Sequence, residues 1–136
     1  MNSDTMRTIR SAKTLDSTRL QLEWSDGTVA VVAMPKVSNP AAVQLGDWGH
    51  SLVWPDGTEI GADSLWLETL TATGRDDVRQ FLEWRLANAL SLAKTAEALG
   101  LARRTVAYYS NGDRPVPKTV LLACKGWDAM HRRKAA

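Results

Sequence analysis

Basic and aromatic side chains gather in one short stretch, residues 91–117, which reads SLAKTAEALGLARRTVAYYSNGDRPVP. Arg103 and Arg104 are adjacent in it, and Tyr108 follows about one helical turn after Arg104. An arginine can donate two hydrogen bonds to O6 and N7 of guanine, and a tyrosine hydroxyl can bond a base or a phosphate. The pattern therefore predicts that Arg103, Arg104 and Tyr108 read bases in double-stranded DNA.

A second set of polar residues surrounds these three and is predicted to bind the DNA backbone. Ser91 and Lys94 flank the start of a predicted helix, whose free N–H groups attract phosphate. The full set is Ser91, Lys94, Thr105, Asn111, Arg114 and Lys118. Alternatives stay open. Each of the six could be an ordinary surface group, the two arginines could be solvated or bind only phosphate, and Tyr108 could pack on its own helix.

Two short helices, residues 92–99 and 103–110, must position these side chains. Gly100 stands at the sharp turn between them, where a residue without Cβ adopts positive φ at little cost. Apolar residues are spaced to meet between the helices: Leu99, Leu101, Val106 and Tyr109. This spacing predicts a helix-turn-helix, although any small helical bundle could share it.

Two further helices are predicted around this pair. Residues 78–89 carry an apolar stripe that includes Arg85, with Asp76 or Asp77 as the cap. Asn111-Gly112 is typical of a helix end, and Pro115 and Pro117 favour the start of a last helix over residues 118–130.

The pieces Ala96–Leu101, Val106 and Asn111-Gly112 resemble the phage-repressor-like helix-turn-helix domains of the lambda Cro and repressor class, over residues 78–128. The resemblance implies that the third helix of the domain enters the major groove and that the chain acts as a homodimer on a palindromic site. The sequence departs from the family at Thr95, where an apolar residue is usual, and at Ala102, where Ser or Thr would cap the helix.

The first 66 residues read instead as short strands separated by turns. Arg19–Trp24 alternates polar and apolar residues, and Asp26-Gly27 predicts a tight hairpin turn before Val29–Ala33. Val29–Ala33 is continuously apolar, which favours burial on both faces. Further strands are predicted at 8–13, 43–45, 51–54 and 58–60, the last of which extends the sheet, and a short helix follows with Asp63 as its cap.

Three pieces of this half resemble the uncharacterised bacterial family called domain of unknown function 2442, over residues 7–68. They are residues 19–28, 52–57 and 60–66. The family implies a small α+β domain and no activity. The predicted fold class is therefore α+β: a small N-terminal α+β domain of short strands, residues 1–70, then an all-α lambda-repressor-like helix-turn-helix domain, residues 76–130, and a basic tail, residues 131–136.

Catalysis, metals and cofactors are not indicated by the remaining residues. His50 and His131 are the only histidines, and no nucleotide-binding or nucleophile motif is present. Cys124 lies in an apolar run and is expected to be a buried structural thiol. The aromatic residues of the first half are expected to form its small core, with one possible exposed docking residue among them: Trp24, Trp48, Trp54 and Trp66.

The charge of the chain changes sign at about the same place where the predicted strands give way to predicted helices. Residues 1–75 hold six Lys or Arg against nine Asp or Glu, a net −3, whereas residues 76–136 hold eleven against six, a net +5. We therefore expect a cytoplasmic, non-enzymatic transcriptional regulator or repressor without a membrane segment, whose first domain could bind a protein partner or mediate dimerisation. The alternative is a protein-interaction module or an antitoxin that binds a partner protein.

Overall fold

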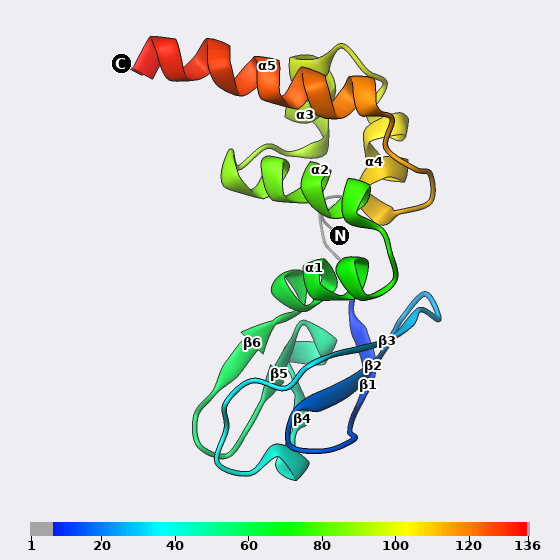
Figure 1. Cartoon of the computed structure of the whole chain (residues 1–136), viewed down its shortest axis with the longest axis vertical. Helices are drawn as coiled ribbons and strands as arrows, with labels where there is room; N and C mark the ends of the chain where they lie inside the picture. The colour runs from blue at the N-terminus through cyan, green and yellow to red at the C-terminus, as the bar shows by residue number, and fades with distance from the viewer. Residues whose placement is uncertain (1–6, 136) are drawn as a thin grey trace. The chain divides into compact units, whose positions relative to one another are not determined.

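The computed structural model describes residues 7–135, which fall into two compact units, 7–74 and 75–135 (Figure 1). Residues 1–6 and 136, at the outer ends of the predicted first domain and basic tail, lie outside the described part, as do the side chains of residues 133–135. Within the described range, no helix combines the length and hydrophobicity that crossing a membrane requires.

The first unit contains two antiparallel sheets of three strands each. Strands β1 (Ile9–Thr14), β2 (Arg19–Trp24) and β3 (Val29–Ala33) form one sheet in that order. The second sheet is built from the short strands β4 (Gln44–Gly46), β5 (Ser51–Val53) and β6 (Glu59–Gly61). Helix α1 (Ala62–Ala72) follows at once, and 3₁₀ turns lie at Pro40–Ala42 and Asp47–Gly49.

The fold class predicted from the sequence is corrected by this arrangement. The predicted domain of short strands does not form one sheet: the strands separate into two antiparallel sheets of three strands each, and five α-helices follow them. The order of strands first and helices afterwards agrees with the prediction. The single-sheet expectation was wrong because alternation along a strand specifies which face is buried but not which strand lies beside it.

Three Asp-x-Thr turns close the loops of the first unit. The carboxylates of Asp16, Asp26 and Asp56 accept hydrogen bonds from the backbone N–H two residues later, at 2.8, 3.0 and 2.9 Å. The N–H of Thr18 holds the pKa of Asp16 at about 2, and that of Thr58 lowers the pKa of Asp56. Burial raises the pKa of Asp26, but hydrogen bonds from Thr28 and the charge of Arg7 outweigh it and lower that pKa.

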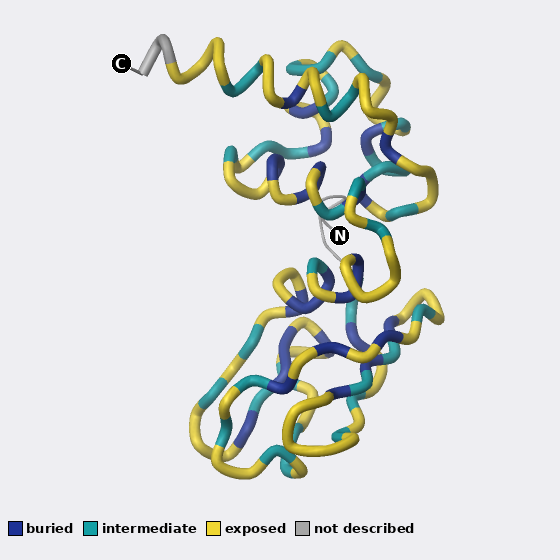
Figure 2. Tube along the Cα trace, viewed as in Figure 1, coloured by how far each residue is buried: buried dark blue, intermediate teal, exposed yellow. Residues whose placement is uncertain are grey.

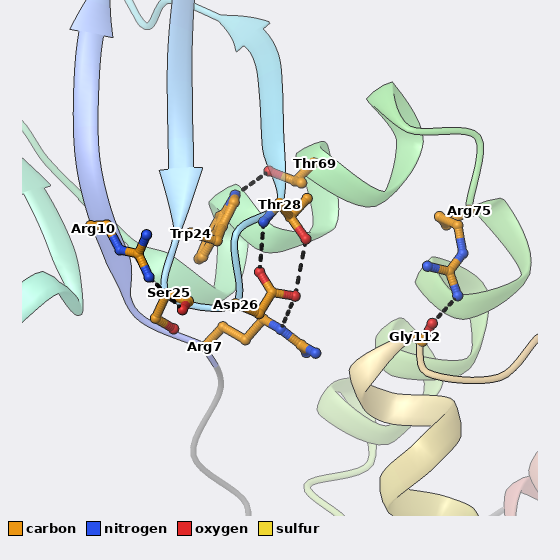
Figure 3. A network of polar contacts seen from close by, with 9 residues as sticks. All are labelled: Arg7, Arg10, Trp24, Ser25, Asp26, Thr28, Thr69, Arg75 and Gly112. Carbon is orange, nitrogen blue, oxygen red and sulfur yellow. Dashed lines mark hydrogen bonds and ion pairs between the residues drawn. The ribbon is translucent and has the colours of Figure 1, made fainter.

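The core of the first unit lies between the β1–β3 sheet and α1. Trp24 packs edge-to-face on Trp66, and its indole N–H donates to Thr69 Oγ1 at 2.9 Å (Figure 3). Trp54 is also buried, whereas Trp48 is 94% exposed and has φ 56°. The expectation of an aromatic core with one exposed tryptophan is therefore confirmed.

Strand β3 is buried on only one face, contrary to the prediction. Ala30 and Val32 point into the core, whereas Val29 and Val31 are 53% and 42% exposed (Figure 2). Successive residues of β3 face the core and the solvent in turn, but all of them are apolar, so the sequence shows no alternation of polar and apolar residues.

The second unit contains four helices. These are α2 (Asp76–Ala87), α3 (Leu92–Leu99), α4 (Arg103–Asn111) and α5 (Lys118–Ala135). Val78, Phe81, Leu82 and Val106 are fully buried between them. Residues 131–135, predicted to be a separate basic tail, continue α5. The predicted caps are also corrected: Arg75 and Gly61, rather than an aspartate, occupy the N-cap positions of α2 and α1.

Candidate nucleic-acid interface

The turn between α3 and α4 has the geometry predicted from Gly100. Gly100 is left-handed, with φ 68° and ψ 35°, and its N–H donates to the carbonyl of Ala96. A Cβ added there would meet no atom within 4 Å, so the backbone conformation, not crowding, is what requires glycine. The chain then enters α4 at Ala102, which offers no side-chain cap.

Helix α4 separates its residues cleanly into two faces. Val106 and Ser110 are buried, and Tyr109 packs edge-to-face on Phe81 with ring centroids 5.7 Å apart. Arg104, Tyr108 and Asn111 follow one another at helical spacing on the other side, where Arg103 and Arg104 are exposed and Tyr108 is half-buried. Arg104 and Tyr108, two of the three predicted base-reading residues, therefore share one side of α4. Arg103, seven residues before the buried Ser110, is exposed because it stands at the first position of the helix.

Arg114 is brought to the same side of α4 by the loop that follows it. Its guanidinium lies 4.2 Å from the centre of the Tyr108 ring, within the range of a cation–π contact. The contact is possible because Gly112 is left-handed, with φ 77°, and reverses the chain after Asn111. Tyr108, predicted to read a base, and Arg114, predicted to bind the backbone, thus form one stacked pair.

The other predicted backbone contacts lie at helix starts. Ser91 caps α3, its Oγ accepting from the Lys94 N–H at 3.1 Å. Lys94 is exposed in the first turn of α3, Thr105 is half-buried in the first turn of α4, and Lys118 is the exposed first residue of α5. The structure places these residues without testing their roles, which stay predictions.

A buried arginine on α2 holds the two helices of the helix-turn-helix together by hydrogen bonds. Arg85 on α2 is only 7% exposed. Its Nε donates to Thr95 Oγ1 at 3.2 Å, its Nη1 to Ser110 Oγ at 2.8 Å, and its Nη2 to the Leu90 carbonyl at 3.0 Å. One guanidinium therefore links α2, the loop after it, α3 and α4.

This network explains the unusual Thr95, which stands where an apolar residue was expected. Thr95 is fully buried and supplies an acceptor to Arg85, and Ser110 passes the contact on by donating to the Val106 carbonyl at 2.8 Å. Arg85 was expected on the apolar stripe of α2, but no role was predicted for it. Its signal was the coincidence of three polar residues, Arg85, Thr95 and Ser110, at core positions of three helices.

A second set of contacts holds the loop after α4. The Arg75 guanidinium donates to the Gly112 carbonyl (Figure 3). The Asp77 carboxylate accepts from the Val116 N–H at 2.7 Å. The start of α2 therefore anchors both ends of the loop that carries Arg114.

Cys124 on α5 is a further candidate for chemistry in this unit. Cys124 is buried as expected, and burial raises the pKa of its thiol to about 11, which disfavours a reactive thiolate. Among residues 7–135, no group of three His, Cys, Asp or Glu side chains could hold a metal ion.

The fold and this surface define a chain with a mixed first unit and a helix-turn-helix in the second. No protein-family model matches the chain, and no curated protein sequence matches it. It is similar to a solved structure from Nitrosomonas europaea ATCC 19718, named "Putative DNA Binding Protein NE0471". The two share 32% sequence identity with a TM-score of 0.65, over 95% of this chain and 91% of that one. The chain belongs to the same family as this Nitrosomonas protein.

Proposed function

We propose that the chain is a sequence-specific DNA-binding regulator that inserts α4 into the major groove. The observation that carries this proposal is the pair of exposed arginines, Arg103 and Arg104, in the first turn of α4 directly after a left-handed glycine. The N-terminal residues of a second, recognition helix are those that contact base edges in helix-turn-helix proteins. The name of the Nitrosomonas relative supports the same class of partner.

Different residues of the surface are assigned different tasks. Arg103 and Arg104 donate to guanine, and Tyr108 contacts a base edge beside Arg114. Ser91, Lys94 and Lys118 stand at the starts of helices, whose free N–H groups add to the attraction for phosphate. Thr105 and Asn111 complete the backbone contacts. We expect a homodimer on two half-sites about one helical turn of DNA apart.

The test combines selection of binding sites from random duplexes with a salt titration. Arg103→Ala or Arg104→Ala should cost about 1–3 kcal/mol and relax the preference at one base pair, since only guanine presents that acceptor pair. Lys94→Ala should weaken all sequences alike and reduce the salt slope by about one, since phosphate is the same at every step.

A matched control removes one positive charge elsewhere. Lys36 is exposed in the first unit, so Lys36→Ala should leave site preference and salt slope unchanged. If both arginine variants bind DNA with wild-type preference and affinity, α4 does not read bases. The protein-interaction or antitoxin hypothesis then becomes the better one.

A further inference from the structure

Strand β3 leaves one edge of the first sheet without a hydrogen-bonded neighbour. Trp24 N–H donates to the Thr28 carbonyl at 2.8 Å, and Met34 N–H donates to the Thr18 carbonyl at 3.0 Å, at the two ends of the β2–β3 ladder. Because peptide groups alternate in direction along a strand, the N–H and C=O groups of three β3 residues point away from β2. These residues are Val29, Val31 and Ala33. Within the described part of the chain, nothing hydrogen-bonds to their outward groups.

The composition of this edge lacks the charges, prolines and bulges that normally prevent pairing. Val29–Ala33 contains no charge and no proline, and its register with β2 is regular. The opposite edge strand, β1, has an irregularity between Ile9 and Ser11 and carries Arg10 and Lys13. In the second sheet both edge strands are only three residues long. A regular, uncharged apolar edge is a template for another strand.

We propose that β3 pairs antiparallel with β3 of a second copy of this chain, about a two-fold axis at Val31. In this register Val31 faces the partner's Val31, and Val29 faces the partner's Ala33. All three outward peptide groups of each strand are then used, giving about six hydrogen bonds between the chains. If one strand were shifted by two residues along the other, only two of the three outward-facing residues of each strand would find a hydrogen-bonding partner.

The outer face of the sheet is complementary in this same register. Within one chain, Glu23 lies opposite Val29, Gln21 opposite Val31, and Arg19 opposite Ala33. A row of side chains across the four paired strands therefore runs from Glu23 through Val29 and the partner's Ala33 to the partner's Arg19. The central row has uncharged glutamines at both ends. No like charges meet beside the axis, and the exposed Val29 and Val31 side chains gain apolar neighbours.

The pairing of the two β3 strands rests on the proposed function in one respect only: it would form the homodimer that the proposed DNA binding uses. It needs no DNA, so it is measured on the free chain. Failure of DNA binding would leave it untouched, and a monomeric chain could still bind a single half-site.

The first experiment is sedimentation of the full chain over a wide dilution series. The wild-type chain should be dimeric, and Val31→Lys should be monomeric, because two ammonium groups would meet at the axis. Gln21→Lys is the matched control: it adds the same charge on the same face of the central strand and should stay dimeric. A monomeric wild-type chain, or a Val31→Lys variant that remains folded and dimeric, overturns the proposal.

A cross-linking experiment decides the matter even if Val31→Lys does not fold. Directly opposed residues in such a hydrogen-bonded pair have Cα atoms about 5.5 Å apart, within the range that a disulfide spans. Val31→Cys should therefore form a covalent dimer under mild oxidation, since Cys124 is buried and does not compete. Gln21→Cys, one strand further from the axis, should not. Equal cross-linking of the two variants, or none in Val31→Cys, overturns the proposed register.

Discussion

Polar side chains close turns in residues 7–74, whereas in residues 75–135 they connect helices. Asp16, Asp26 and Asp56 each bond to a backbone N–H two residues away. Arg85, by contrast, reaches Thr95 and Ser110 on two other helices. A turn that uses its own carboxylate depends little on the rest of the unit. A buried guanidinium shared by three helices makes their arrangement depend on one side chain.

The two units also differ in what they leave exposed. The second unit presents cationic residues on and around α4, where Arg103, Arg104, Arg114 and Lys118 are exposed. The first unit presents valines along the edge strand β3 and the fully exposed Trp48. We propose that the second unit binds DNA and that the first binds another copy of the chain. The following predictions concern the interactions that hold each unit together.

The largest effect is expected for Arg85→Ala. The change removes the donors for Thr95, Ser110 and the Leu90 carbonyl and leaves a cavity between three helices. We expect a loss of about 2–5 kcal/mol in the free energy of unfolding of the helical unit. Urea unfolding followed by near-ultraviolet circular dichroism measures it.

Arg79→Ala is the control for Arg85→Ala, because it removes an arginine of the same helix that pairs with Glu83 at the surface. It should cost less than about 1 kcal/mol. Equal losses for the two variants would contradict the central role given to Arg85.

A smaller loss is expected for Gly100→Val. The φ of 68° is unfavourable for a β-branched residue, and the strain should cost about 1–3 kcal/mol and reduce DNA binding by misorienting α4. Gly126→Val is the matched control, because Gly126 also has open space around it but lies within helix α5. It should change stability by only a few tenths of a kcal/mol. A Gly100→Val variant as stable as Gly126→Val would remove the conformational argument for the turn.

Thr95→Val tests the network from the acceptor side. The two side chains have nearly the same shape, so the change removes one acceptor of Arg85 with little loss of packing. About 1–2 kcal/mol should be lost, as measured by the same urea unfolding. Thr119 is exposed on α5, and Thr119→Val should change stability by less than about 0.5 kcal/mol. If Thr95→Val stabilises the chain, the hydroxyl is not needed by Arg85.

The smallest effect is expected from acid on the turns of the first unit. The pKa of Asp16 is lowered to about 2 in the folded chain from an ordinary value of 3.8. A lowered pKa stabilises the fold above the ordinary value, and this contribution is lost as the pH falls from about 3.8 towards 2. Asp26 and Asp56, whose pKa values are lowered too, act in the same direction.

The acid effect is checked by thermal unfolding at pH 5 and at pH 2.5, comparing the wild-type chain with Asp16→Asn. The wild-type chain should have a lower melting temperature at pH 2.5 than at pH 5. In Asp16→Asn this drop in melting temperature should be smaller. An unchanged difference would mean that the Asp16 turn does not contribute to the acid sensitivity.

The sequence alone determined the local features of this chain, because each depends on residues close together along it. Gly100 and Gly112 specified left-handed turns, Ser91 specified a cap, and the 3.6-residue period separated Arg104 and Tyr108 from Val106 on α4. Asp26-Gly27 likewise specified a hairpin turn, since the conformation is set within a few residues.

The tertiary structure alone decided features that join distant residues. It separated the strands into two sheets, because strand pairing is chosen among many competing edges. It buried Arg85, because its partners Thr95 and Ser110 are 10 and 25 residues away. It also exposed one side of Val29–Ala33, because the alternation of an all-apolar strand becomes visible only when one face is covered by a core and the other is not.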